Sequence, residues 1–131
     1  MGFDQYHEPP EELSAEVRSF ARICTSLTEE AEAISWYHQR LAVEPDPQAR
    51  AIMSDSLGEE YKHFSMDLEF LLRRTPRWRA IAEGVLFQGG DIVEHGEEAE
   101  AADEHDDGGG EPGAGGAQDG SLDIGGLRET R

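Results

Sequence analysis

The stretch of the chain with the clearest chemical potential is Glu60-Tyr61-Lys62-His63, a Glu-x-x-His sequence. Residues three apart share one face of a helix, so Glu60 and His63 can offer an oxygen and a nitrogen to the same metal ion. Surface helices contain many such pairs, and the motif alone is a weak signal. The signal is stronger in this chain because the other residues on the same face of the predicted helix are apolar, namely Leu57, Phe64 and Leu68.

A second carboxylate, Glu30, can be placed beside this pair by counting. Glu30 and Glu60 are equally far from Pro45, which lies in the clearest break in the first part of the chain, residues 43–47. Two helices folded back on each other at this break would bring Glu30 level with Glu60 and His63. A Glu from each of two helices and a Glu-x-x-His from each of two others form the ligand set of di-iron and di-manganese carboxylate bundles. One chain carries half of this set, so a complete centre needs two copies.

The elements that must position these residues are predicted to be long helices. A seven-residue repeat predicts one helix over residues 11–41. Its seam consists of Leu13, Phe20, Ile23, Leu27, Glu30, Ile34, Tyr37 and Leu41. Asp46 as N-cap, followed by Pro47, predicts a second helix to about Arg74. Thr75-Pro76 repeats this signal and predicts a short third helix through about Phe87.

These helices predict an all-α fold, an antiparallel two-helix hairpin plus a short third helix. One such subunit cannot bury both long apolar faces, and a domain of this size is marginal as a monomer. Dimerisation would complete a four-helix bundle and, at the same time, a site of two Glu and two Glu-x-x-His. Such a mixed oxygen and nitrogen set suits iron or manganese, and zinc also accepts it.

The composition changes along the chain and indicates three regions. Residues 1–88 are expected to form the helical domain. Twelve of the 15 glycines follow, among Asp, Glu and Ala, and predict an acidic, disordered linker over residues 89–119. Its His95 and His105 are assigned to a solubilising spacer, with loose cation binding as the alternative. In the last region, residues 120–131, Leu122, Ile124 and Leu127 form an apolar strip that could dock in a groove.

The charge and the single cysteine exclude several classes of protein. With 29 acidic and 11 basic residues, the chain carries a formal net charge of −18, so it favours cations and is a poor partner for nucleic acid. Cys24 has no partner for an intrachain disulfide, which favours a reducing compartment. The N-terminus lacks the features of a signal peptide, and no apolar run is long enough for a membrane span. We therefore expect a cytoplasmic protein with no membrane partner.

The residues around Glu30 allow more than one interpretation. Glu29 and Glu32 either belong to a solvated acidic face or form an outer, weaker metal site that feeds the inner one. Tyr37 lies one heptad after Glu30, and packing beside the centre is favoured over a redox role. His38 is expected at the surface and Cys24 in the apolar core.

The motifs quoted above resemble those of the encapsulated ferritins of prokaryotes. The resemblance rests on residues 29–37, on residues 59–63 with Leu71-Leu72-Arg73-Arg74, and on residues 121–127, which look like the peptide that loads cargo into encapsulin shells. It covers nearly all of residues 8–87 and the last dozen. It implies a ferritin-like bundle completed by dimerisation, a ring of dimers that is usually a decamer, and residence inside an encapsulin nanocompartment.

The resemblance also implies roles for individual residues. In the family, the counterparts of Glu30, Glu60 and His63 come from two subunits and hold two iron ions. The outer metal-entry carboxylates correspond to Glu29 and Glu32, and a tryptophan beside them corresponds to Trp36. The shell-targeting core corresponds to Leu122, Ile124, Gly125 and Leu127.

The function expected from these residues is that of a ferroxidase, which oxidises Fe(II) with oxygen for storage in the shell. Its catalytic set would be Glu30, Glu60 and His63, with Tyr37 beside them. Two alternatives remain open at this point. One is a di-metal oxygenase or peroxidase on the same scaffold, and the other is a non-catalytic metal-binding cargo adaptor.

Overall fold

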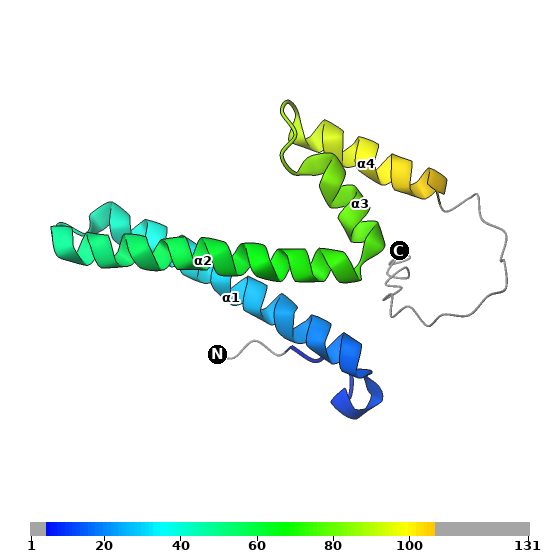
Figure 1. Ribbon diagram of the computed structural model, residues 1–131, viewed down its shortest axis with the longest axis horizontal. Coiled ribbons are helices and arrows are strands. Elements are labelled where there is room, and N and C mark those ends of the chain that lie inside the picture. The colour runs from blue at the N-terminus through cyan, green and yellow to red at the C-terminus, as the bar shows by residue number, and fades with distance from the viewer. Residues whose placement is uncertain (1–4, 107–131) are drawn as a thin grey trace. The chain divides into compact units, whose positions relative to one another are not determined.

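The computed structural model describes residues 5–106, and all regular structure in this range is helical (Figure 1). A short 3-10 turn, Pro10–Glu12, precedes four helices: α1, Ala15–Val43; α2, Pro47–Arg74; α3, Pro76–Val85; and α4, Ile92–Asp106. The described residues divide into two compact units, of which the first ends at Leu71 and the second begins at Leu72. The predicted all-α class and the hairpin of two long helices are confirmed.

Helix α1 begins later than the heptad pattern predicts. Pro10–Glu12 form the 3-10 turn and Leu13 is extended, so the helix starts at Ala15 rather than near residue 11. Ser14 is its N-cap, because the hydroxyl accepts a hydrogen bond from the main-chain N–H of Val17 at 3.2 Å. Two prolines in sequence with a capping serine behind them explain the later start.

The turn between α1 and α2 is fixed by side chains around the predicted break. The carboxylate of Asp46 accepts a hydrogen bond from the main-chain N–H of Ala49 at 2.8 Å, which confirms Asp46 as the cap of α2. The guanidinium of Arg50 donates to the carbonyl oxygens of Leu41 and Glu44. These bonds tie the end of α1 to the start of α2 and set the two helices antiparallel.

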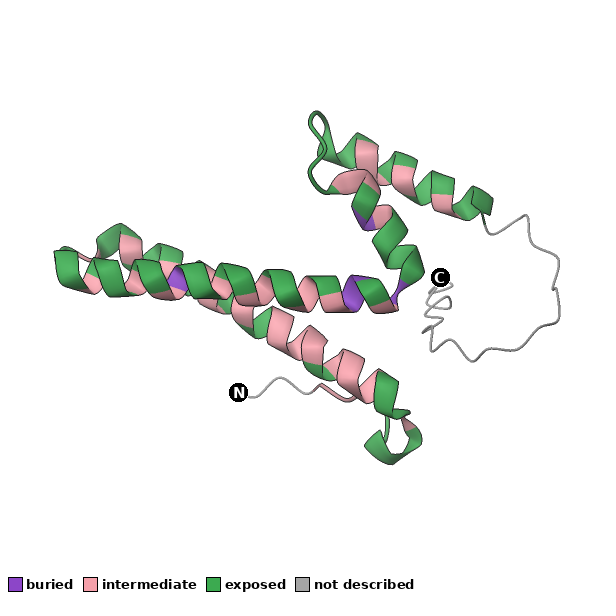
Figure 2. Cartoon of the chain, in the orientation of Figure 1, coloured by how far each residue is buried: buried purple, intermediate pink, exposed green. Residues whose placement is uncertain are grey.

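Apart from Leu13, which precedes the helix, the predicted seam lies on the partly covered face of α1. All eight seam residues are half-buried, and none of the residues of α1 is fully buried (Figure 2). In α2, Leu57 and Leu71 are buried, whereas Ile52, which also fits the apolar pattern, is 61% exposed. The hairpin alone therefore covers only part of the apolar surface that the sequence provides.

Residues 92–106 differ from the sequence expectation, which placed them in a flexible linker. They form α4, which packs against α3. Asp91 caps α4 by accepting a hydrogen bond from the N–H of Glu94 at 2.9 Å, and Arg77 pairs with Asp103 at 2.7 Å. Gly84 permits the close approach of the helices, because a Cβ at this position would lie 2.6 Å from the Cβ of Ala99. Residues 107–131, including the rest of the linker and the strip at 120–131, lie outside the described range.

Two further details of the second unit concern its turns. Thr75 precedes α3 as predicted, but its buried hydroxyl makes no capping hydrogen bond. At the turn into α4, a ring nitrogen of His95 lies 2.7 Å from the carbonyl oxygen of Gly89 and so closes the loop.

Among residues 5–106, no helix is long and apolar enough to cross a membrane.

Candidate metal centre

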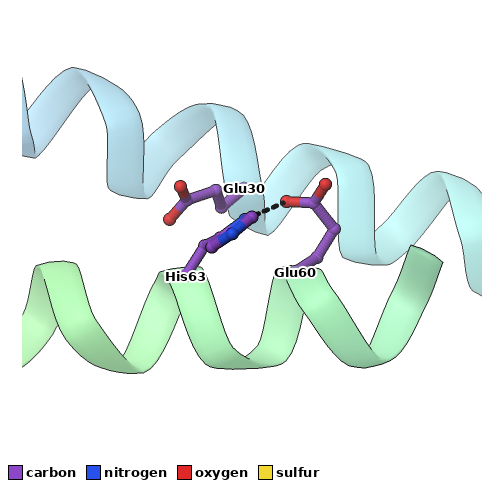
Figure 3. Close-up of side chains that lie close together, drawn as sticks. All are labelled: Glu30, Glu60 and His63. Carbon is purple, nitrogen blue, oxygen red and sulfur yellow. Dashed lines mark ion pairs between the residues drawn. The ribbon is translucent and has the colours of Figure 1, made fainter. Parts of the chain in front are cut away.

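Glu30, Glu60 and His63 come together within the first unit. One ligand atom from each lies within 4.8 Å of the other two, and α1 supplies the first residue while α2 supplies the other two (Figure 3). All three are half-buried. The residues that the sequence placed at one level across a predicted turn therefore form a group that could hold a metal ion.

The imidazole of His63 is held only loosely between two carboxylates. Its Nδ1 lies 3.8 Å from Glu60 Oε2, and its Nε2 lies 3.9 Å from Glu59 Oε2. Both distances exceed those of a hydrogen bond, and the side chain is 44% exposed. The ammonium of Lys62 donates a hydrogen bond to Glu59 and thereby lowers the pKa of that carboxyl. The ring can therefore turn toward a ligand with little loss of existing contacts.

Glu30 has an electrostatic environment that opposes its negative charge. Burial is the first cause, followed by the neighbouring carboxyl groups of Asp67, Glu60 and Glu29, and together they raise the pKa of Glu30 to about 7. An ionised carboxylate here lacks the compensation that a buried charge needs. A cation beside Glu30 would provide that compensation.

Asp67 lies beside this group of residues and was not identified from the sequence. Its carboxyl group adjoins that of Glu30 at hydrogen-bonding range. Asp67 follows His63 by four residues and Glu60 by seven, and this helical spacing is a signal that could have identified it. However, Asp67 is not part of the group within 4.8 Å that Glu30, Glu60 and His63 form.

Two oxygens of this site are buried without a hydrogen-bond donor. Glu30 Oε2 and Asp67 Oδ2 are both inaccessible to solvent, and no donor among the described residues reaches either atom. Buried polar atoms are normally paired, and a site for an ion is one of the common explanations for an exception. Oxygen-rich ligands with one imidazole fit iron or manganese. The residues present therefore fit a divalent metal ion.

The residues that the sequence predicted beside the centre differ in how far they are exposed to solvent. Glu29 and Glu32 are exposed and stand outside the three-residue group, and Trp36, which is 49% exposed, lines an open pocket with Gln39 and Arg40. Tyr37 is half-buried on the seam. The guanidinium carbon of Arg40 lies 5.3 Å from the centre of its ring.

His38 has a role that the sequence did not indicate. It is exposed as expected, but its Nε2 lies 2.7 Å from the hydroxyl oxygen of Tyr61, so it links α1 to α2. Cys24 is half-buried, and burial raises the pKa of its thiol. A raised pKa leaves less of the reactive thiolate, as expected for a packing residue.

Comparisons with known proteins cover the part of the chain that contains this centre. The family model described as EncFtn-like matches residues 5–89. A "Ferritin-like protein" of Thermotoga maritima is 41% identical over 102 residues, which are 78% of this chain and 90% of the relative. An "Encapsulated ferritin-like protein" of Rhodospirillum rubrum is 39% identical over 125 residues, which are 93% of this chain and 86% of the relative. A protein of Nitrosomonas europaea with a known crystal structure has a TM-score of 0.65 and 37% identity, covering 68% of this chain and 99% of that protein.

Proposed function

The chain belongs to the EncFtn-like family, and we propose that it is a ferroxidase that oxidises Fe(II) to Fe(III) at a di-iron centre shared by two copies of the chain. The observation that carries this proposal is the group of Glu30, Glu60 and His63, whose ligand atoms lie within 4.8 Å of one another across the hairpin. This group is half of the ligand set of a di-metal carboxylate bundle.

The incomplete core of the hairpin supports the shared centre. No residue of α1 is fully buried, although its seam is apolar over most of its length. A second hairpin packed on that seam would remove apolar surface from water at about 25 cal/mol per Å² and would bring a second set of ligands opposite the first. The family resemblance further leads us to propose a ring of such dimers, with ten chains as the expected number.

Each residue near the centre has a distinct part in the proposed reaction. Glu30, Glu60 and His63 bind and orient the substrate iron, and iron supplies one electron per ion to oxygen when two ions are held close together. Glu29 and Glu32, exposed on α1, attract Fe(II) from solvent toward the inner ligands, with Trp36 beside them. Tyr37 packs near the centre on the seam and limits access of water.

We further propose that the protein works inside an encapsulin shell in the cytoplasm, where the oxidised iron is stored. The name of the Rhodospirillum rubrum relative supports encapsulation, and Leu122, Ile124, Gly125 and Leu127 would dock in the shell. A chain that ends at residue 119 is expected to keep its metal chemistry and to lose loading when it is co-produced with the shell protein. Equal loading of the two chains would reject this role for residues 120–131.

The central experiment separates metal binding from oxidation. The assembled protein is titrated with Fe(II) without oxygen, then exposed to oxygen while Fe(III) absorbance and oxygen consumption are recorded. Glu30→Ala is expected to lower the oxidation rate by at least about tenfold, since it removes a ligand whose loss also disturbs its neighbours. Glu16→Ala removes an exposed acidic residue of the same helix and serves as the matched control.

The outcomes of this experiment distinguish the proposed function from its alternatives. Full oxidation by Glu30→Ala would reject the centre. Iron uptake without oxygen consumption would indicate a metal-binding adaptor instead. Oxidation of an added organic substrate in step with oxygen use would indicate an oxygenase or peroxidase.

A further inference from the structure

We propose that Asp67 is a fourth metal-binding side chain of each chain's half of the centre, where it holds a divalent cation jointly with Glu30. This inference rests on the proposed metal centre and deepens it. It extends the ligand set beyond the three residues indicated by the sequence motif.

The first argument is the position of Asp67 on α2. Glu60, His63 and Asp67 follow one another at intervals of three and four residues, so they lie along one face of the helix. All three are half-buried. The side chain of Asp67 therefore extends the row of possible ligands by one helical turn on the face that carries the other two.

The second argument is the contact between Asp67 and Glu30. The carboxyl groups of Asp67 and Glu30 adjoin, although one comes from α2 and the other from α1. The carboxylate of Glu30 therefore has the group of Glu60 and His63 and the carboxyl group of Asp67 as neighbours. Carboxylates bridge metal positions in di-metal bundles.

The third argument is the pair of oxygens that lack a donor. Glu30 Oε2 and Asp67 Oδ2 are both fully buried, and no N–H or O–H group of the described residues points to them. Two adjoining carboxylates repel each other, and their lost hydration is not replaced by hydrogen bonds. A divalent cation between them would remove the repulsion and satisfy both oxygens. The alternative is a proton shared by the two carboxyl groups with no part in metal binding.

The experiment uses the full-length protein, stripped of metal with a chelator and titrated with Co(II) in the absence of oxygen. Co(II) reports the number and type of its ligands through its visible absorption, and calorimetry gives the affinity. Asp67→Asn keeps the shape of the side chain and adds an N–H donor, but it weakens metal binding. Asp55→Asn is the matched control, since Asp55 is an exposed residue earlier on the same helix.

Asp67→Asn is expected to lower Co(II) affinity by at least about tenfold and to change the Co(II) absorption. It is also expected to raise the melting temperature of the metal-free protein, because the new amide can donate to Glu30. Asp67→Glu should restore part of the affinity. Asp55→Asn should match the parent protein in all three measurements.

Unchanged affinity and absorption in Asp67→Asn would overturn the inference and favour the shared proton. A lower affinity with an unchanged absorption would also overturn it, because Asp67 would then only position Glu30. Failure of the proposed function is recognised separately. Co(II) binding by the parent protein that is independent of Glu30 rejects the centre itself, and binding without iron oxidation rejects only the ferroxidase activity.

Discussion

Glu30 lies where the charge of the site is least compensated within one chain. Its carboxyl group is surrounded by three other carboxyl groups, those of Asp67, Glu60 and Glu29, and its raised pKa reflects burial first and this crowding second. A ligand with these neighbours is unfavourable without a cation and becomes favourable with one. In the proposed metal centre, the crowding that disfavours the metal-free protein would favour binding of a divalent ion.

The raised pKa of Glu30 predicts how the stability of the metal-free protein depends on pH. Between the ordinary value of 4.5 and the folded value of about 7, the folded protein keeps a proton that the unfolded chain has lost. Protons thus stabilise the folded state in this window, and the stability falls as the pH rises through it and levels off above 7. Glu30→Gln, which resembles the protonated form, should lack this fall.

The measurement is the denaturant midpoint of the chelator-treated protein, parent minus Glu30→Gln, across the same pH range. The difference should become more negative with rising pH. Metal affinity should show the opposite trend and rise toward pH 7, because the metal must displace the proton. A difference that is constant with pH would contradict the predicted crowding at Glu30.

The sequence allowed Glu30, Glu60 and His63 to be predicted as one group, which the structure brings together, and it left Asp67, the proposed fourth ligand, unrecognised. Glu60 and His63 share a motif, and Glu30 lies at a matching distance from the turn, so counting along two helices was sufficient. Asp67 has the right helical spacing, but acidic residues are common on this chain. Asp67 stands out only because its carboxyl group is buried against that of Glu30. This contact depends on how α1 packs on α2.

At the scale of the elements, the start of α2 was predicted better than the content of the acidic region. Asp46 and Pro47 gave the start of α2 because capping is local chemistry. Asp91 caps α4 by the same chemistry, but the prediction for this region used only the abundance of glycine and acidic residues after residue 89. Helix α4 forms because it packs on α3, and packing partners cannot be read from composition.

The close packing of α3 and α4 predicts opposite effects for two glycine substitutions. Gly84→Ala would place its Cβ 2.6 Å from that of Ala99, so the helices must move apart. We expect a loss of about 1–3 kcal/mol in the stability of this pair. Gly96→Ala in α4 meets nothing within 4 Å and should stabilise the helix by about 0.5–1 kcal/mol.

Hydrogen exchange followed by mass spectrometry measures both effects directly in α4. Faster exchange of residues 92–106 is expected in Gly84→Ala and slower exchange in Gly96→Ala. Unchanged exchange in Gly84→Ala would show that α4 does not depend on its contact with α3.

At the scale of the whole molecule, an apolar seam and half a ligand set occur on the same hairpin. Each would be unfavourable in a permanent monomer, the seam because it is only partly covered and the ligands because their charges repel. One partner hairpin would resolve both. The sequence predicts the proposed dimer only because one partner would meet both of these requirements at once.

Metal binding and assembly should therefore be coupled. A cation that binds only the assembled state stabilises it by RT ln(1 + [L]/Kd), which is about 2.7 kcal/mol when the metal concentration is one hundred times Kd. Adding Fe(II) or Co(II) without oxygen to a dilute, chelator-treated protein should shift monomers to dimers or larger rings, as measured by light scattering after size separation. The Glu30→Ala variant should show no metal-dependent shift, while Glu16→Ala should behave like the parent. If the association state of the parent protein is the same with and without metal, metal binding and assembly are not coupled. The apolar seam and the metal centre would then need independent explanations.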